Sequence, residues 1–455
     1  MSGADAAPLR IVGLADTDSY VKWAAHLLGA LGPAWSPVLT VVTTPLVVSD
    51  AQLTSALAGS GLAALDVERR DLDAVAERLR ADPPDVVLVA GRGPLVRLLA
   101  SVVADIVPRP VIVTGLPGIS IPATRKALLY RAQCDLFVVH SQRERRDFTA
   151  LAREQGVPHR FALATLPFAR GGVTERHTAV VGETAATAAG ADLVFAAQAK
   201  VPALAAHRRH VARLLVRAAR ARPDRRVVVK LRAKPGESQT HLEETDYRDL
   251  VAELGPMPEN LVFSTAPMAR ALDSAGGLVT VSSTAAIEAI ARGVGVIALD
   301  SFGVSAELIN EVLADAGLLG SEADVEARRF RHPAPHWLAE NYFHDPSADD
   351  WEEQTARLVR ARRRGDLVPR PPVAGRGGTL RAAWDRKVVL GPLDTSAAGR
   401  LATVVGVPVR AVVRAARRVR NRAAARSDRQ QPAARGSSAQ ERSTSAVRTS
   451  TTSTG

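Results

Sequence analysis

Hydrophobic residues along this chain gather in short apolar runs, and each run is followed by a turn and a longer amphipathic segment. In the first part, the runs occupy residues 9–15, 37–42, 85–90, 110–114, 135–140 and 160–166. Continuous Val, Ile and Leu character without alternation is typical of parallel strands that are buried on both faces. The segments between the runs have helical periodicity, so the pattern predicts a doubly wound α/β sheet.

The pattern stops over residues 170–190 and then starts again, which indicates an interdomain connection. The later runs occupy residues 192–197, 226–231, 260–264, 277–281 and 294–300. The predicted fold class is therefore α/β, with two Rossmann-like domains that face each other across a cleft. We expect these domains to span residues 1–175 and 176–368.

The rhythm weakens from residue 323 onward, where the sequence predicts loops rich in aromatic and charged residues and one helix over 350–363. Residues 369–426 are expected to form a linker and basic C-terminal helices. The Ser-, Thr- and Gln-rich residues 427–455 are expected to be disordered, because they contain too few apolar side chains to form a core.

Composition narrows the class of protein. Hydrophobic residues make up 46% of the chain and charged residues 23%, which is a globular balance and excludes a fibrous or wholly disordered chain. Cys134 is the one cysteine, which excludes an intramolecular disulfide and a cysteine-based metal site. Neither a secretory signal nor a run of about 18 uncharged apolar residues is present, so we expect a cytoplasmic protein without a transmembrane helix.

Most of the positive charge lies in the C-terminal segment. Residues 401–455 contain eleven arginines, no lysine and two acidic residues, and so carry nine of the net +12 charges. Over residues 401–420, Val and Ala alternate with Arg at helical spacing, and such a helix can bind an anionic membrane at the inner face of the plasma membrane. A role in solubility is the alternative. A nucleic-acid partner is not expected, because no recognised nucleic-acid-binding fold accompanies the segment.

The first group of candidate site residues follows the apolar run at 277–281. Ser282, Ser283 and Thr284 open a predicted helix, where free backbone N–H groups and hydroxyls can bind a phosphate. Glu288 lies one turn further, where its carboxylate could accept hydrogen bonds from ribose hydroxyls. The alternative is structural: a hydroxyl that caps the helix and an acid that complements the helix dipole.

The second group consists of Lys230, Arg232 and Lys234, which end another predicted strand before a Pro-Gly turn. Permanent cations at this place can bind a diphosphate, although a solvated basic strand end has the same composition.

The third group contains the candidate proton acceptors Asp16, Asp18 and His140, which follow predicted strands of the first domain. The carboxyl edge of a parallel sheet is the usual ligand side, so any of them could deprotonate an acceptor hydroxyl. Asp18 or Ser19 could instead be a helix N-cap, and His140 could be structural. The Asp-x-Asp spacing also suits a metal, but two α/β domains argue against that interpretation, and we expect no metal.

Residues 277–300, with the serine pair and Glu288, resemble the donor-binding element of GT-B glycosyltransferases. They are similar above all to bacterial capsule and teichoic-acid polymerases, polysialyltransferases and non-hydrolysing sugar-nucleotide epimerases. The resemblance implies that Ser282, Ser283 and Thr284 hold the donor phosphate and that Glu288 holds the ribose. Capsule-type transferases often carry Lys-x-His-Pro near the second group, whereas this chain has Lys234 in place of the histidine.

Residues 15–23 and 117–124 resemble a family of actinobacterial proteins assigned as glycosyltransferases, over residues 9–390. These resemblances imply a metal-independent glycosyltransferase that moves a sugar or polyol phosphate from a nucleotide-activated donor to a hydroxyl acceptor. The donor is a substrate, and no cofactor is expected. Residues 1–175 would hold a glycan, lipid-linked or small-molecule acceptor, and residues 176–368 the donor, in cell-envelope or polysaccharide synthesis.

Two alternatives stay open. A sugar-nucleotide epimerase uses the same fold, and it would turn over a nucleotide sugar with no acceptor present. A non-catalytic GT-B-like protein would dock to an anionic membrane through its basic tail and would ignore nucleotides.

Overall fold

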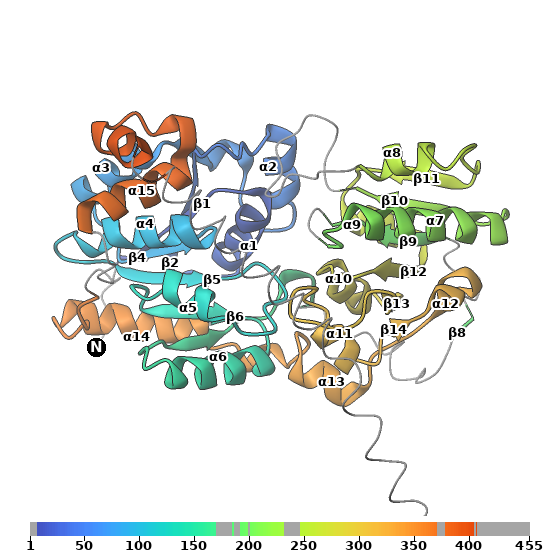
Figure 1. Cartoon of the computed structure of the whole chain (residues 1–455). Coiled ribbons are helices and arrows are strands. Elements are labelled where there is room, and N and C mark those ends of the chain that lie inside the picture. The colour runs from blue at the N-terminus through green and yellow to red at the C-terminus, as the bar shows by residue number, and fades with distance from the viewer. Residues whose placement is uncertain are drawn as a thin grey trace, which may run out of the picture. The chain divides into compact units, whose positions relative to one another are not determined.

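The computed structural model describes residues 7–169, 184–185, 192–198, 201–231, 246–370, 378–404 and 406. The chain forms two compact units, residues 1–374 with 389–393 and residues 375–388 with 394–455. Both large sheets belong to the first unit (Figure 1). The second unit contains most of helix α15 (Gly378–Leu390).

The first half of the larger unit is built on a parallel sheet with the strand order β3-β2-β1-β4-β5-β6-β7. Its strands are β1 (Leu9–Ala15), β2 (Trp35–Val42), β3 (Glu68–Arg70), β4 (Val86–Ala90), β5 (Val111–Gly115), β6 (Leu136–Val139) and β7 (Phe161–Leu163). Its helices are α1 (Asp18–Gly29), α2 (Asp50–Leu57), α3 (Leu72–Ala81), α4 (Gly93–Ala104), α5 (Arg125–Tyr130) and α6 (Gln142–Glu154), with short 3₁₀ turns η1 (Ala64–Asp66) and η2 (Pro167–Ala169).

The second half has a parallel sheet with the strand order β11-β10-β9-β12-β13-β14. Its strands are β9 (Asp192–Ala196), β10 (Val227–Lys230), β11 (Leu261–Ser264), β12 (Ala275–Thr280), β13 (Gly295–Leu299) and β14 (Leu319–Gly320), and β8 (Thr184–Ala185) pairs antiparallel with β15 (Arg329–Phe330). Its helices are α7 (Ala205–Ala221), α8 (Tyr247–Ala252), α9 (Met268–Asp273), α10 (Ala285–Ala291), α11 (Glu311–Asp315), α12 (Glu322–Ala327) and α13 (Pro335–Glu340).

The predicted fold class of two Rossmann-like α/β domains is confirmed. In both halves the chain first builds the sheet in one direction and then returns across its first strand, so β1 lies beside β4 and β9 lies beside β12. At such a switch point the two loops at the carboxyl ends leave the sheet in opposite directions and open a crevice where ligands bind. The strand order therefore predicts one ligand-binding edge in each half.

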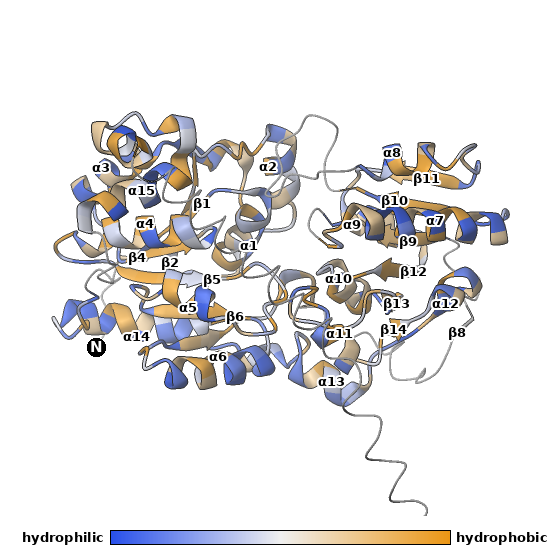
Figure 2. Ribbon diagram, viewed as in Figure 1, coloured by the Kyte–Doolittle hydropathy of each residue, from blue (hydrophilic) through white to orange (hydrophobic). Residues whose placement is uncertain are grey.

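The apolar runs form strands because their side chains feed two hydrophobic layers at once. Along β4, Val86 and Leu88 join the core cluster on one face of the sheet, whereas Val87 and Val89 join the cluster on the other face. All four are fully buried. Figure 2 shows the same contrast as hydrophobic strands beneath helices with hydrophilic outer surfaces.

Helix α14 (Trp351–Arg363) follows the second half in the sequence but packs against the first sheet (Figure 1). Trp351, Leu358 and Val359 are buried in the same cluster as β1 and β4. The helix over 350–363 was predicted, but its periodicity alone could not show which sheet it would cover.

Several short elements were not predicted. Helix α2 and strand β3 lie between the second and third predicted strands, and α12, β15 and α13 form where the sequence suggested loops. The predicted connection at 170–190 lies outside the described residues except for β8. Residues 401–404 are helical, while most of the predicted arginine-rich helix and the whole tail 427–455 lie outside the described residues. Among the helices that the structure describes, none has the length and apolar character needed to cross a bilayer.

Candidate functional site

A cavity of about 1000 Å³ lies at the carboxyl ends of both sheets. The first half contributes α1, the loops after β4 and β5, and α5, and the second half contributes the loops after β9, β10 and β12. The predicted donor-binding residues Lys230, Ser282, Ser283, Thr284 and Glu288 all line it.

The cavity does not reach every predicted site residue. The candidate proton acceptors Asp16, Asp18 and His140 are described in the structure but are not among the residues that line the cavity. The two sets of predicted residues therefore differ in their access to a ligand.

The second-half switch point is held together by Gln198, which follows β9, and Ser282, which follows β12. The Gln198 side chain donates from Nε2 to Ser282 Oγ at 3.2 Å, and its Oε1 accepts from the Ser282 backbone N–H at 3.0 Å. This pair joins the two diverging loops. Because Ser282 Oγ acts as an acceptor here, its own hydroxyl proton stays available for a ligand.

Ser283 and Thr284 complete the turn before α10. Ser283 Oγ accepts from the Ala285 backbone N–H at 3.2 Å, while Thr284 occupies the N-cap position without a side-chain capping bond. The structural interpretation of this motif thus applies to Ser283, and the Thr284 hydroxyl has no capping role. As with Ser282, the Ser283 hydroxyl can still donate its proton.

Glu288 is the acidic residue in the first turn of α10, and it is only 8% exposed. In the described part of the chain, its carboxylate has no hydrogen bond and no ion pair, although it lines the cavity. Enclosing a carboxylate without a partner costs free energy, and that cost falls when a ligand supplies hydroxyl donors. Glu288 is therefore placed to accept hydrogen bonds from a ligand.

Lys230 is the last residue of β10 and is 7% exposed. It lines the cavity, and its Nζ donates to the Leu231 carbonyl. The other two cations predicted for this group, Arg232 and Lys234, lie outside the described residues.

At the first-half switch point, a charged pair takes the place that the neutral pair Gln198 and Ser282 has in the second half. Asp16 follows β1 and is fully buried, and its Oδ2 accepts from Arg92 Nε at 2.9 Å. Arg92 follows β4 and lines the cavity, so Asp16 lies behind it. Burial raises the pKa of the Asp16 carboxyl, and Arg92 opposes this effect. Among the described residues, the second oxygen, Oδ1, has no hydrogen-bond partner.

Asp18 is the first residue of α1 and is half-buried. The prediction that Asp18 or Ser19 caps this helix is wrong, because the N-cap position is occupied by Thr17 and makes no side-chain capping bond. Asp18 instead belongs to the first turn, where an acid complements the helix dipole.

His140 is buried, and both of its ring nitrogens are engaged. Trp23 Nε1 donates to His140 Nε2 at 2.7 Å, and His140 Nδ1 lies 2.7 Å from the Ala164 carbonyl oxygen. Because the Trp23 indole N–H can only donate, Nε2 is the acceptor and the proton resides on Nδ1, although Nε2 also lies 3.0 Å from the Leu116 carbonyl oxygen. Burial also lowers the pKa of His140. The geometry thus favours the structural alternative over proton abstraction from an acceptor hydroxyl.

A buried carboxylate that the sequence analysis did not select lies beside His140. Glu144 accepts from the backbone N–H groups of His140 at 2.8 Å and Ser120 at 2.9 Å, and from the Tyr342 hydroxyl at 2.8 Å. Ser120 belongs to the loop after β5 that lines the cavity, and Tyr342 comes from the second half. Glu144 therefore fixes a wall of the cavity and joins the halves.

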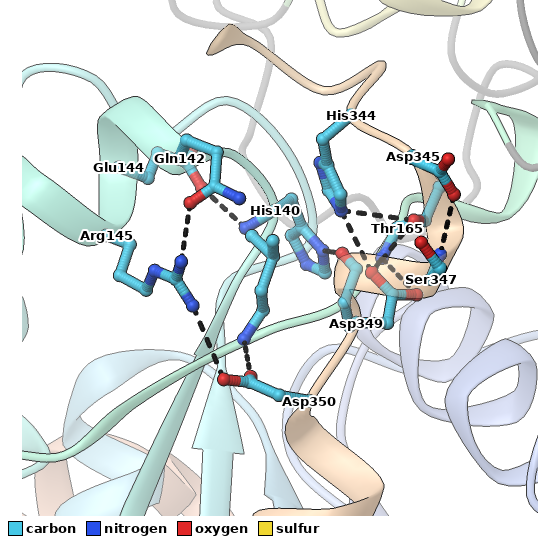
Figure 3. A network of polar contacts seen from close by, with 12 residues as sticks. His140, Gln142, Glu144, Arg145, Thr165, His344, Asp345, Ser347, Asp349 and Asp350 are labelled. Atoms are coloured by element: carbon cyan, nitrogen blue, oxygen red, sulfur yellow. Dashed lines mark hydrogen bonds and ion pairs between the residues drawn. The ribbon is translucent and has the colours of Figure 1, made fainter. Parts of the chain in front are cut away.

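Figure 3 shows how the chain returns to the first sheet next to this carboxylate. Asp349 accepts from the Thr165 backbone N–H and hydroxyl and lies 2.9 Å from His344 Nε2. Asp350 accepts from the Leu163 N–H at 2.7 Å and pairs with Arg145 at 3.3 Å. These contacts hold the start of α14 against the end of β7.

No group of three or more His, Cys, Asp and Glu side chains suited to a metal ion occurs among the described residues. The candidate site is thus composed of hydroxyls, an enclosed carboxylate and cations. Such groups recognise a ligand that carries both phosphate and hydroxyl groups.

A model of the family described as "Putative glycosyltransferase (DUF6716)" matches residues 11–358 of this chain. Among curated proteins, none matches it. The fold is similar to that of S. aureus MnaA in a co-structure with UDP, with a TM-score of 0.50 and 13% identity over 81% of this chain and 100% of that chain. It is also similar to Methanocaldococcus jannaschii UDP-GlcNAc 2-epimerase in complex with UDP-GlcNAc and UDP, with a TM-score of 0.50 and 11% identity over 77% and 100%. At these identities the similarity concerns the fold, and the predicted GT-B-like arrangement is confirmed.

Proposed function

Because this chain belongs to the family described as "Putative glycosyltransferase (DUF6716)", we propose that it transfers a glycosyl group from a nucleotide-activated donor to a hydroxyl acceptor. A polyol phosphate is an alternative transferred group. The observation that supports this function best is Glu288, an enclosed carboxylate that lines the cavity and lacks a partner among the described residues. It lines the same cavity as hydroxyl groups and a lysine that suit the phosphates of such a ligand.

In this proposal the second half binds the donor. The hydroxyls of Ser282 and Ser283 and the ammonium of Lys230 contact the diphosphate, and Glu288 accepts from the ribose hydroxyls. The same donors stabilise the negative charge that grows on the diphosphate as it leaves, which is why we propose a reaction without a metal ion. The relatives of similar fold that were solved with UDP make uridine nucleotides the first probes.

The first half would bind the acceptor. We assign no general base, because none of the three predicted proton acceptors lines the cavity. Asp16 takes a positioning role in this proposal, since its ion pair directs Arg92 along the cavity wall. We also propose an acceptor from cell-envelope or polysaccharide synthesis, which a peripheral membrane location would suit.

Nucleotide binding tests the donor site. Thermal shift and calorimetry with UDP, GDP, CDP, CMP, TDP and their common sugars would be compared for the wild type and Glu288→Ala. A ligand at a hundred times its dissociation constant stabilises the fold by about 2.7 kcal/mol, so one nucleotide should raise the melting temperature of the wild type. This shift should fade in Glu288→Ala. Glu311→Ala is the matched control, because Glu311 also lies in the first turn of a helix but does not line the cavity.

Three outcomes separate the candidate functions. If UDP-GlcNAc is converted with no acceptor present, the epimerase alternative replaces the transferase, and the similarity to epimerase folds keeps this alternative worth testing. If a nucleotide sugar is consumed only with an acceptor, the transferase stands. If no nucleotide binds at millimolar concentration, the donor site is refuted and the non-catalytic alternative remains.

A further inference from the structure

Among the described residues, the two walls of the cavity differ in charge. On the first-half wall, Lys22, Arg92, Lys126 and Arg131 line the cavity together with no acidic residue. On the second-half wall, the described lining residues include one cation, Lys230, and the carboxylate of Glu288. Among the described residues, the first-half wall therefore carries more cations than the second-half wall.

Arg131 is the most deeply buried of these cations, with only 2% of its surface exposed. Its guanidinium donates to the Gly115 carbonyl at 3.2 Å and the Gly91 carbonyl at 3.4 Å, and lies over the Phe137 ring. No carboxylate pairs with it in the described part of the chain, and its Nε has no hydrogen-bond partner there. A buried charge without a counter-charge is costly, so an anion in the cavity would stabilise it.

Lys22 and Lys126 extend the positive wall toward solvent. Lys22 is half-buried on α1 and lies 5.9 Å from the centre of the Phe168 ring, and Lys126 is exposed on α5 and lies 5.8 Å from the centre of the Tyr130 ring. Neither lysine forms a hydrogen bond or an ion pair with another described residue. Arg92, in contrast, is already paired with Asp16.

We infer that the first-half wall binds a phosphate group of the second substrate, which makes that substrate a phosphorylated acceptor. This inference rests on the proposed function, because it assigns the second substrate of the same cavity. A phosphate monoester carries close to two negative charges at neutral pH, so it gains more from this group of cations than a carboxylate with one charge, and lysine is a common phosphate ligand. A cavity of about 1000 Å³ is at the upper end for a single ligand and so has room for two substrates.

The test compares ligands that differ only in the phosphate. Glycerol 3-phosphate, glycerol and acetate would be titrated into the full-length protein, with and without saturating UDP, at constant ionic strength. The wild type should bind glycerol 3-phosphate and neither of the others. The double variant Lys22→Met/Lys126→Met, which keeps unbranched side chains, should bind it at least about tenfold more weakly, a loss of about 1.4 kcal/mol. Lys126→Met alone is the second variant, because an exposed side chain is the safer one to replace.

Arg125→Met is the matched control, because Arg125 is an exposed cation on the same helix that does not line the cavity. It should leave the affinity for glycerol 3-phosphate unchanged. Equal weakening in this control would overturn the inference in favour of general charge attraction. The inference is also overturned if the wild type does not bind glycerol 3-phosphate, or if the lysine variant loses UDP affinity, which would assign these lysines to the donor.

The same measurements distinguish failure of this inference from failure of the proposed function. If glycerol 3-phosphate binds through the two lysines but no nucleotide binds, the phosphate subsite stands and the donor site fails. Binding to vesicles of phosphatidylcholine with and without phosphatidic acid then shows whether the phosphate belongs to a lipid or to a soluble acceptor. A lipid-borne phosphate should bind the wild type and Arg125→Met better than the lysine variant, with the basic tail unchanged in all three proteins. A soluble phosphate should show no such difference.

Discussion

The two halves of this chain share one strand order, and they differ at the place where that order reverses. At the first switch point, the loops after β1 and β4 are joined by an ion pair between buried Asp16 and Arg92. At the second, the loops after β9 and β12 are joined by two neutral hydrogen bonds between Gln198 and Ser282. Both pairs join diverging loops, but they leave different groups for a ligand.

The neutral pair leaves a hydroxyl proton on Ser282 that can be donated into the cavity. In the charged pair, the guanidinium of Arg92 lines the cavity, and the carboxylate of Asp16 is buried behind it. One backbone plan thus leaves a hydroxyl donor at one edge of the cavity and a guanidinium at the other. The difference is entirely in the side chains, which is why the fold alone does not establish the reaction.

Two buried glutamates extend the comparison. Glu144 accepts three hydrogen bonds and is fully buried. Glu288 has none within the described residues and lines the cavity. The carboxylate of Glu144 therefore serves the fold, and we propose that the carboxylate of Glu288 binds a ligand.

Replacing these glutamates by alanine should give the largest contrast. Glu144→Ala leaves the N–H groups of His140 and Ser120 and the Tyr342 hydroxyl without their acceptor, at about 1–3 kcal/mol for each unsatisfied group. We expect the free energy of unfolding to fall by at least about 3 kcal/mol in urea titrations. Glu288→Ala should change it by less than about 1 kcal/mol and abolish nucleotide binding instead.

Tyr342→Phe is a second variant that keeps the prediction testable if the Glu144→Ala protein fails to fold. It removes one donor to a charged acceptor, so the loss should be about 1.5–3 kcal/mol. If Glu288→Ala destabilised the protein as much as Glu144→Ala, the division between structural and ligand-binding carboxylates would be wrong.

The contact between the halves beside the cavity gives the next largest effect. A methyl group at Gly118, on the loop after β5, would lie 2.6 Å from Thr284 Oγ1 and 3.3 Å from its Cγ2. Gly118→Ala should therefore destabilise the protein by about 1–3 kcal/mol through overpacking. Thr284→Ala removes both atoms, so it should recover the part of the loss that comes from this contact, while the cost of the positive φ at Gly118 remains. Thr284→Val should recover none of it.

Urea unfolding of the four proteins in each double-mutant cycle measures this coupling. An interaction energy of at least about 1 kcal/mol is expected with Thr284→Ala. If the two losses of unfolding free energy simply add, the cost of Gly118→Ala arises within the loop after β5 and not from a contact with Thr284.

Ser282→Ala is expected to have a smaller effect. It removes the hydrogen bond from Gln198 Nε2 but keeps the one from the backbone N–H to Oε1. The free energy of unfolding should fall by about 0.5–1.5 kcal/mol, as measured by urea titration. Gln198→Ala removes both bonds and should cost more, and equal losses would show that the backbone bond contributes nothing.

The sequence was sufficient to predict the two sheets, because a strand buried on both faces requires an unbroken apolar run. The run 86–90 is such a case, since its alternate residues enter opposite cores. The sequence was also sufficient to predict that Lys230, Ser282 and Glu288 lie at one edge, because parallel strands end on the same side of a sheet. In contrast, the three-residue strand β3 (Glu68–Arg70) has charged residues and no apolar run to reveal it.

The structural residues of the site were harder to predict because their partners lie far away in the sequence. His140 follows a buried strand, as a catalytic histidine would, but Trp23 and the Ala164 carbonyl occupy its nitrogens. Glu144 had a local signal, the serine three residues before it, whose hydroxyl accepts from the Glu144 N–H. That signal indicates a helix start, and it contains no information about the Tyr342 hydroxyl from the other half.

The smallest expected effect concerns pH, and it tests the charge difference between the switch points directly. Burial raises the pKa of Asp16 above its ordinary value of 3.8, so the folded protein holds this proton more tightly than the unfolded chain. Stability should therefore be lost as the pH rises from about 3.8 through the folded pKa. Asp16→Asn cannot titrate, so its free energy of unfolding should rise relative to the wild type across that window.

Urea unfolding of both proteins between pH 4 and 7 measures this difference. His140 and His159 titrate in the opposite sense, because burial lowers their pKa values, to about 4 for His159. Their contribution is lost as the pH falls below 6.5, but it is common to wild type and variant and cancels in the difference. Ser282→Ala is the control from the other switch point, where neither Gln198 nor Ser282 titrates, so its effect should be independent of pH. If the wild type instead gained stability over Asp16→Asn with rising pH, the Arg92 ion pair would outweigh burial, and the first switch point would be held by charge as effectively as the second is by neutral hydrogen bonds.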